Sequence, residues 1–423
     1  MSKIQLNNIW QKIVALLFSS VYSSACSAIG LFLMLKVMGL NSYGTLMLAF
    51  SYITIVGVLF NLQSYDSFVR FMPEYERNEK KNQLISQLFI TDIITALIAF
   101  FISILLYYPL MKIFSWNHEL SRCYLILSFF IIFNIKGTFD GIYRYYNFFN
   151  WISIRDTISA SILLVFYFLG YVLNLDIYYF SLILVIQPML RLVFDFMYLI
   201  KVQEKIKLKF YMNVSIDKKV LKFNFISNLT SHVDLPIKHL TPIIIASIIG
   251  VDSLGFFKVL ERFGNIIRVF ISVFSQFFGS EISRLISLGR ISDVLKLGRK
   301  FTFVCLFFGF VVTIIYYFLI KKITFNDFVF TEINVIDSSL YVLYMFIISS
   351  MFYQHSVAIY SGLEVKVLKL AMLINCIYLI LLIPISLSFS LMGVILFQIL
   401  QSITIFVIKD SFIRGKYNVH PSV

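Results

Sequence analysis

Long apolar stretches recur along this chain, and they constrain its fold more than any other feature. A helix needs about 20 mainly apolar residues to cross the hydrocarbon core of a bilayer. A transmembrane β-barrel would instead show alternating segments of about ten residues, which continuous runs such as LVFYFLGYVL are not. We therefore predict an all-α integral membrane protein with twelve spans, at residues 13–35, 45–66, 88–111, 123–143, 157–174, 178–200, 223–249, 256–280, 301–320, 338–362, 370–388 and 391–410.

The composition supports a membrane environment. Hydrophobic residues make up 59% of the chain and charged residues 14%, whereas soluble domains are about half apolar and about a quarter charged. The letters SSAC at residues 23–26 resemble a lipoprotein cleavage box, but the apolar character continues to Leu35, beyond the roughly 7–15 residues of a signal h-region. We expect a retained helix. The four cysteines lie far apart, so we interpret them as apolar packing residues and expect no metal and no cofactor.

The net charge of +14 would suit nucleic-acid binding, but its distribution indicates membrane topology instead. If the N-terminus is inside, 25 of the 36 Lys and Arg residues lie in inner segments and 5 lie in outer segments. This asymmetry follows the positive-inside rule. We therefore expect both termini and the segment 201–222 in the cytoplasm, and no nucleic-acid partner.

Two short motifs indicate an internal repeat. MGLNSYG at residues 38–44 follows the first span, and IGVDSLG at residues 249–255 follows the seventh, at an offset of 211 residues. In both motifs glycine supplies backbone freedom, and Asn, Asp or Ser can close a tight turn. We predict two six-helix halves related as a parallel repeat: an N-terminal bundle at 1–200, a basic cytoplasmic linker at 201–222, and a C-terminal bundle with a cytoplasmic tail at 223–423.

Several stretches resemble one family of membrane transporters. LMLKVMGLNSYGTLMLAF, YDSFVRFMPEY and IIGVDSLGFFKVLERFGNIIRVF are similar to sequences of bacterial polysaccharide-unit flippases of the multidrug/oligosaccharidyl-lipid/polysaccharide exporter superfamily. Length, helix number and the central basic linker agree over nearly the whole chain. One departure is FFGSEISRL, with Gly279 and Ser280 where relatives commonly have a proline.

The resemblance implies a V-shaped pair of bundles that alternates between inward-open and outward-open states. It also implies a substrate, an undecaprenyl-pyrophosphate-linked oligosaccharide such as an O-antigen unit of lipopolysaccharide, which crosses the bacterial inner membrane. A polysaccharide polymerase and a chain-length regulator are the protein partners that it implies.

The eighth span carries the clearest polar face. At about 100° per residue, its polar side chains share an arc of about 120° and the opposite face is apolar. A charged side chain at a helix centre costs at least about 2.5–3.5 kcal/mol, so it should face protein or a watery cavity. An interfacial helix lying flat on the membrane is the alternative reading. The residues of this polar face are Lys258, Glu261, Arg262, Asn265, Arg268, Ser272 and Gln276.

Other charges within spans can pair along one helix. Lys136, Asp140 and Arg144 are spaced i, i+4, i+8 in the fourth span, and Arg191 with Asp195 is spaced i, i+4 in the sixth. Neighbours at this spacing can form ion pairs without any ligand. For Arg191 and Asp195 we favour such a structural pair, and for the fourth span both readings stay open.

The stretch SHVDLPIKHL at residues 231–240 places charges inside the seventh span. Asp234 and Lys238 are i, i+4 partners, His232 and His239 lie nearby, and Pro236 can bend the helix. A bent, polar span suits a moving cavity wall, and a structural ion pair is the alternative.

The chain shows none of the phosphate-loop, dinucleotide-binding or HExxH motifs that would indicate ATP hydrolysis or another enzyme activity. We therefore expect a transporter, with proton coupling, sodium coupling and product pull all open. A drug or cation antiporter of the same superfamily should have an acidic cavity, whereas these span charges lean basic. A membrane-embedded polymerase should have a large periplasmic loop, whereas the longest outer segment is 321–337.

These arguments give two sets of candidate site residues. We predict substrate binding by Lys238, Lys258, Arg262, Arg268, Asn265 and Lys136. We predict that the coupling or cavity acids and histidines are Asp234, Glu261, Asp140, His232 and His239.

Overall fold

The computed structural model of the chain describes most of the sequence. It covers residues 3–417 except 61, 63, 78–79, 212–216, 232–235, 266, 269–284, 286–289, 325–333, 352, 355–356 and 358–362. Within these helices, the backbone alone is described for 3–13, 229–231, 236, 320, 322–324 and 364.

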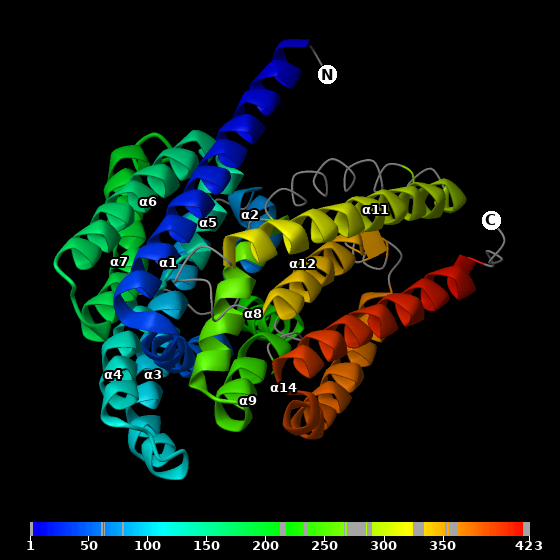
Figure 1. Cartoon of the computed structure of the whole chain (residues 1–423). Coiled ribbons are helices and arrows are strands. Elements are labelled where there is room, and N and C mark those ends of the chain that lie inside the picture. Colours follow the sequence, from blue (N-terminus) through cyan, green and yellow to red (C-terminus); the bar gives the residue numbers. More distant parts are fainter. Residues whose placement is uncertain are drawn as a thin grey trace. The chain divides into compact units, whose positions relative to one another are not determined.

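All the elements that the structure describes are helices (Figure 1). They fall into two compact units, residues 1–232 and 233–423. The first unit contains α1 (Lys3–Phe60), α2 (Ser64–Arg77), α3 (Lys81–Ile113), α4 (His118–Phe133), α5 (Gly137–Tyr145), α6 (Phe149–Val172), α7 (Ile177–Val202) and α8 (Lys218–Ser231). The second contains the π-helical turn η1 (Pro236–Leu240), α9 (Thr241–Ile248), α11 (Ile291–Thr324), α12 (Val335–Ser350), α14 (Glu364–Tyr417) and a helical stretch at 251–265.

Seven helical runs in the described part of the chain are long and apolar enough to cross a membrane. Two of them, Val14–Arg77 and Val365–Tyr417, contain 64 and 53 residues. Because a helical residue advances about 1.5 Å and the hydrocarbon core is about 30 Å thick, each of these runs is long enough for two crossings. The predicted all-helical membrane fold is confirmed.

The two repeat motifs form corresponding turns. Gly39 interrupts α1 at φ 71°, and Gly250 follows α9 at φ 128°. Both angles lie in the left-handed region, which a residue without Cβ adopts at little cost. An added Cβ at either glycine would meet no atom within 4 Å, so the backbone angle, rather than close packing, requires glycine at both positions.

The fourth predicted span is an interrupted helix, so its predicted continuity was wrong. The span ends at Phe133 and resumes at Gly137 as α5. In the seventh, the described residues form α8, the π-helical η1 and α9. Pro242, near the start of α9, has no N–H to donate to the carbonyl of Lys238, which favours the wider π turn at this point.

An aspartate of α3 joins the two interrupted regions of the first unit. Asp92 is buried, and its carboxylate accepts hydrogen bonds from the Ser64 hydroxyl at the start of α2 and from the Thr138 backbone N–H (3.1 Å) and hydroxyl (2.7 Å) at the start of α5. A carboxylate is favourable at the positive end of a helix. Asp92 therefore stabilises the beginnings of α2 and α5 together.

Helix α8 packs in the first unit, although the sequence assigned residues from 223 onward to the second bundle. Asn224 bonds to Ser67, and Asn228 donates to the Leu59 carbonyl at 3.2 Å. Arg70 lies over the ring of Phe223, 4.4 Å from its centroid. These contacts hold α8 against α1 and α2, which explains why the boundary between the units falls at residue 232.

Candidate functional site

The second unit contains a cavity of about 230 Å³ lined by η1, the 251–268 region, α12 and α14. Its charged lining residues are Lys238, Glu261, Arg268 and Lys409. Its uncharged polar lining residues are Gln354, Gln398, Gln401 and Ser402, and its aromatic ones are Phe257, Tyr341, Tyr344 and Phe406. Three cations and one carboxylate give the lining a positive balance.

Glu261, the single carboxylate among the lining residues, is paired with Lys258. Lys258 Nζ lies 2.7 Å from Glu261 Oε2 on the same helix, at i, i+3 spacing, and both side chains are largely buried. Arg268 and His239 also interact electrostatically with Glu261. Because Lys258 offsets the Glu261 charge, the cavity presents Lys238, Arg268 and Lys409 as its dominant charges.

Two of the three glutamines that line the cavity are held by hydrogen bonds within the bundle. Gln401 Nε2 donates to Asn375 Oδ1 at 2.9 Å, and Gln354 Nε2 donates to the Phe406 carbonyl at 3.1 Å. Gln398 is 3% exposed, and its Oε1 has no hydrogen-bond partner among the described residues. These amides lie in an apolar bundle, where buried polar groups are costly unless they are paired.

The predicted site residues of the second unit are distributed unevenly. Lys238, Glu261 and Arg268 line the cavity. Arg262 and Asn265 are not among its lining residues, and Arg262 Nε is buried without a hydrogen-bond partner. Lys258, which pairs with Glu261, and His239 are also not among the lining residues. His232 and Asp234 lie outside the described residues, as do Ser272 and Gln276 of the predicted polar face.

The sequence prediction missed Lys409 and the glutamines. Lys409 lies at the inner end of the last span, so the charge count assigned it to the cytoplasmic side. Gln398 and Gln401 are separated by three residues, and this i, i+3 spacing on one helix face was the available signal. No sequence pattern pairs them with Gln354, which comes from a distant segment.

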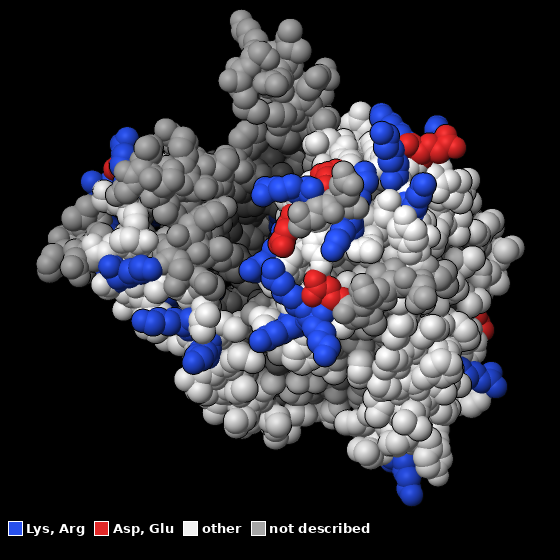
Figure 2. Space-filling view, turned by 180° about the vertical axis from the view of Figure 1, so that it is seen from behind, with Lys and Arg blue, Asp and Glu red and all other residues white. Residues whose placement is uncertain are grey.

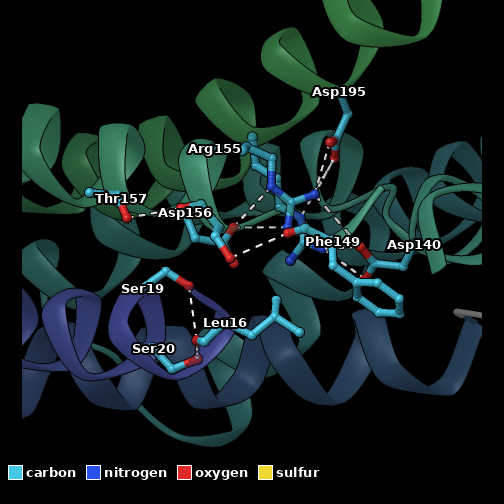
Figure 3. Close-up of polar contacts among 11 residues, drawn as sticks. Leu16, Ser19, Ser20, Asp140, Phe149, Arg155, Asp156, Thr157 and Asp195 are labelled. Carbon is cyan, nitrogen blue, oxygen red and sulfur yellow. Dashed lines mark hydrogen bonds and ion pairs between the residues drawn. The ribbon is translucent and has the colours of Figure 1, made fainter. Parts of the chain in front are cut away.

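The first unit contains a separate ion cluster of five residues from α5, α6 and α7 (Figure 3): Asp140, Arg155, Asp156, Arg191 and Asp195. Arg155 is 1% exposed and donates from one Nη to both carboxylate oxygens of Asp195, at 2.8 and 3.0 Å. It also lies 2.8 Å from Asp156 and 3.6 Å from Asp140. Arg191 donates to both oxygens of Asp140, at 2.6 and 2.7 Å.

This cluster confirms the predicted Arg191–Asp195 pair of the sixth span and corrects the predicted row of charges in the fourth. Lys136 precedes α5, so it does not share a continuous helix row with Asp140 and Arg144. Arg191 and Asp195 approach to 3.7 Å, but the closer cation to Asp195 is Arg155. Lys136 and Asp140 belong to the first unit and do not line the cavity of the second.

Asp217 joins α2 and α3 to the start of α8 in the first unit. The Tyr75 hydroxyl donates to its carboxylate, and its backbone exchanges hydrogen bonds with the Gln87 side chain at 3.1 and 3.2 Å. The Tyr75 bond, helped by the Lys219 backbone N–H, holds the pKa of Asp217 below its ordinary value. Lys and Arg predominate over Asp and Glu on the face shown in Figure 2.

Among the described residues, no group of three or more His, Cys, Asp or Glu side chains could hold a metal ion.

Comparisons with known proteins identify relatives by sequence family and by fold. Residues 9–278 match the family model described as polysaccharide biosynthesis protein. The chain is similar to an inward-facing multidrug resistance MATE family transporter of the MOP superfamily, with 12% identity, a TM-score of 0.71 and coverage of 95% of this chain and 96% of that chain. An outward-facing transporter of the same description has 12% identity, a TM-score of 0.64 and 97% coverage of both chains.

A MOP superfamily transporter from Pyrococcus furiosus, described as having a binding pocket of reverse polarity, has 12% identity, a TM-score of 0.62 and 96% coverage of both chains. At these identities the structural likeness concerns the fold alone. No curated protein matched the sequence.

Proposed function

This chain belongs to the polysaccharide biosynthesis protein family, and on that premise we propose that it is a flippase for an undecaprenyl-pyrophosphate-linked oligosaccharide. The glycan, an O-antigen or similar polysaccharide repeat unit, moves from the cytoplasmic to the periplasmic leaflet of the bacterial inner membrane by alternating access. The lipid tail stays in the bilayer, and no covalent bond changes. A polysaccharide polymerase and a chain-length regulator would act on the delivered unit.

The cationic cavity of the second unit is the observation that carries this proposal. Lys238, Arg268 and Lys409 line it together, while the single lining acid, Glu261, is paired with Lys258. A pyrophosphate that enters such a cavity meets opposite charges within a bundle. At about 4 Å and an effective dielectric constant near 20, each pair is worth on the order of 4 kcal/mol before desolvation is subtracted. Several such pairs can compensate for withdrawing a phosphate headgroup from water.

The neighbouring amides and rings suit the glycan. Ligand pockets combine apolar or aromatic walls with a few placed polar groups, and this cavity joins Tyr341 and Tyr344 to Gln398 and Gln401. Neutral amides and rings add no charge that would compete with the cations for the phosphates.

A drug or cation antiporter is the second candidate. The fold likeness to multidrug resistance transporters and the presence of Glu261 in the cavity favour it. The cation majority of the lining favours an anionic substrate instead, because like charges repel a cationic drug.

The proposal is tested by reconstitution of the purified protein in liposomes with a labelled lipid-linked oligosaccharide. We expect glycan added on one leaflet to become accessible on the other with its mass unchanged. Lys409→Ala and Arg268→Ala should each lower the rate about tenfold or more, since tenfold corresponds to only about 1.4 kcal/mol. Lys369→Ala, an exposed lysine of α14, is the matched control and should retain the wild-type rate.

Three results would contradict the proposal. Transport of a cationic dye such as ethidium without glycan movement would indicate the antiporter. Polymerised product from the protein alone would indicate an enzyme. Full glycan transport by both cavity variants would remove this cavity from substrate binding.

A further inference from the structure

We infer that the uncharged polar and aromatic residues lining the second-unit cavity form a subsite for one sugar ring, and that Gln398 recognises a hydroxyl or amide hydrogen of that ring. The inference rests on the proposed function, because it assigns a part of the same substrate to a part of the same cavity. It adds a specificity-determining residue and separates sugar recognition from phosphate recognition.

The hydrogen bonds of the three glutamines distinguish Gln398 from the other two. Gln401 is paired with Asn375 and Ser402, and Gln354 is paired with the Phe406 carbonyl. Gln398 lies within hydrogen-bonding reach of the Tyr378 hydroxyl, but its Oε1 has no partner. The described structure therefore leaves one buried amide oxygen of a cavity-lining residue unpaired.

An unpaired buried carbonyl oxygen is costly in an empty site and calls for a donor. A phosphate oxygen that carries no proton cannot supply one, because it is an acceptor. A sugar hydroxyl or an acetamido N–H can supply one. The lysines and the arginine on the cavity lining carry donors only, so they suit the phosphates. The two kinds of lining residue thus match the two parts of a sugar pyrophosphate.

The spacing along α14 fits this division. Gln398 and Lys409 both line the cavity and are separated by eleven residues, which is about 16 Å along a helix axis. That length accommodates a sugar ring followed by a pyrophosphate. Tyr341 and Tyr344 of α12 line the same cavity, with ring centroids 5.5 Å apart, and offer apolar ring surface to the carbon face of a sugar.

The size of the cavity limits recognition to one ring. Its volume of about 230 Å³ lies below the roughly 300–1,000 Å³ of pockets that enclose a drug-sized ligand. The sugar nearest the pyrophosphate is therefore the one read by Gln398, and the rest of the glycan lies outside this subsite. The flippase would then accept glycans that differ beyond their first sugar.

The test compares lipids with and without a single sugar. Protein in nanodiscs is titrated with undecaprenyl pyrophosphate and with undecaprenyl pyrophosphate carrying N-acetylglucosamine, N-acetylgalactosamine, glucose or galactose. We expect at least one sugar-bearing lipid to bind more tightly than the sugar-free lipid. Gln398→Leu should reduce that preference about fivefold to tenfold, as expected for one lost hydrogen bond, and should leave the affinity for the sugar-free lipid within about twofold.

Two controls separate recognition from folding. Gln187→Leu makes the same replacement at an exposed glutamine of the first unit and should change neither affinity. Because Gln398→Leu removes an unpaired buried oxygen, the empty variant should be at least as thermally stable as the wild type. A variant that loses stability and affinity for every lipid alike would mean that Gln398 is structural, which overturns the inference.

The failures of the inference and of the proposed function are distinguishable. A wild-type protein that binds none of the lipids contradicts the proposed function itself. A wild-type protein that binds the sugar-free lipid as tightly as every sugar-bearing one overturns the subsite while the flippase proposal stands. Equal preferences in wild type and Gln398→Leu also overturn the assignment of Gln398.

Discussion

Replacing Arg155 by methionine is expected to destabilise the first unit strongly. Arg155 and Asp195 are 1% and 0% exposed, and Arg155 Nη1 lies 2.8 Å from Asp195 Oδ1. At an effective dielectric constant near 20, that separation corresponds to an attraction of about 6 kcal/mol before desolvation. The substitution leaves Asp195 with Arg191 at 3.7 Å as its remaining described cation. Breaking a buried pair from one side typically costs about 3–5 kcal/mol.

The measurement is thermal unfolding of the detergent-solubilised protein. For a unit of this length, about 1 kcal/mol shifts Tm by roughly 2–4 °C, so Arg155→Met should lower Tm by on the order of 10 °C. Arg290→Met is the matched control, because Arg290 and Asp293 form a pair at 2.6 Å whose side chains are 61% and 38% exposed. An exposed pair contributes about 0–1 kcal/mol, so the control should lose little.

A double variant tests the physical reason. In Arg155→Met/Asp195→Leu no unpaired carboxylate remains at position 195, and replacement of both partners of a buried pair by apolar residues is often neutral. We expect the double variant to recover much of the lost stability. A single variant as stable as Arg290→Met, or a double variant less stable than the single one, would refute the reasoning.

Three further predictions follow from the described contacts. Asp92→Ala should destabilise the protein by about 1–3 kcal/mol for each buried donor left unpaired, whereas Asp92→Asn, which keeps an acceptor, should cost less; equal losses in thermal unfolding would contradict this. Asp217 has a lowered pKa in the folded protein, so its stabilising contribution is present above the unfolded pKa of about 4 and is lost as the pH falls through the folded value. The Tm values of wild type and Asp217→Asn should therefore differ near pH 7 and converge in acid. A Tm difference that stays constant with pH would exclude this linkage. Reporter fusions after Lys209 and after Asn334 should report cytoplasm and periplasm respectively, because basic residues concentrate in the inner segments; periplasmic activity at the first site or cytoplasmic activity at the second would refute the topology.

Local sequence predicts the features of this fold that have local causes. The span pattern follows from hydropathy alone, and the turns at Gly39 and Gly250 follow from a backbone angle that favours glycine. The break between α4 and α5 was missed because apolar side chains such as Phe139 and Ile142 recur beyond it. The start of α5 is stabilised by Asp92 of α3, which lies 46 residues before Thr138 in the sequence.

The difference between local and distant causes also explains which residues of the candidate site were predicted. Lys238, Glu261 and Arg268 were found because charges in an apolar span are conspicuous wherever they occur. Lys409 was missed because a lysine at the inner end of a span also satisfies the positive-inside rule. Arg155 lies two residues before its predicted span, and its partner Asp195 is 40 residues away, so helix spacing held no signal for their pairing.

The position of Asp92 between α2 and α5 has a consequence for biogenesis. Ribosomes add about 5–20 residues per second, so Thr138, 46 residues after Asp92, is made roughly 2–9 seconds later. During that interval Ser64 is the only one of its two side-chain partners that has been synthesised. A carboxylate within an apolar helix opposes insertion. We therefore expect the nascent α3 to stay beside α2 until α5 has been made and completes the bonding of Asp92.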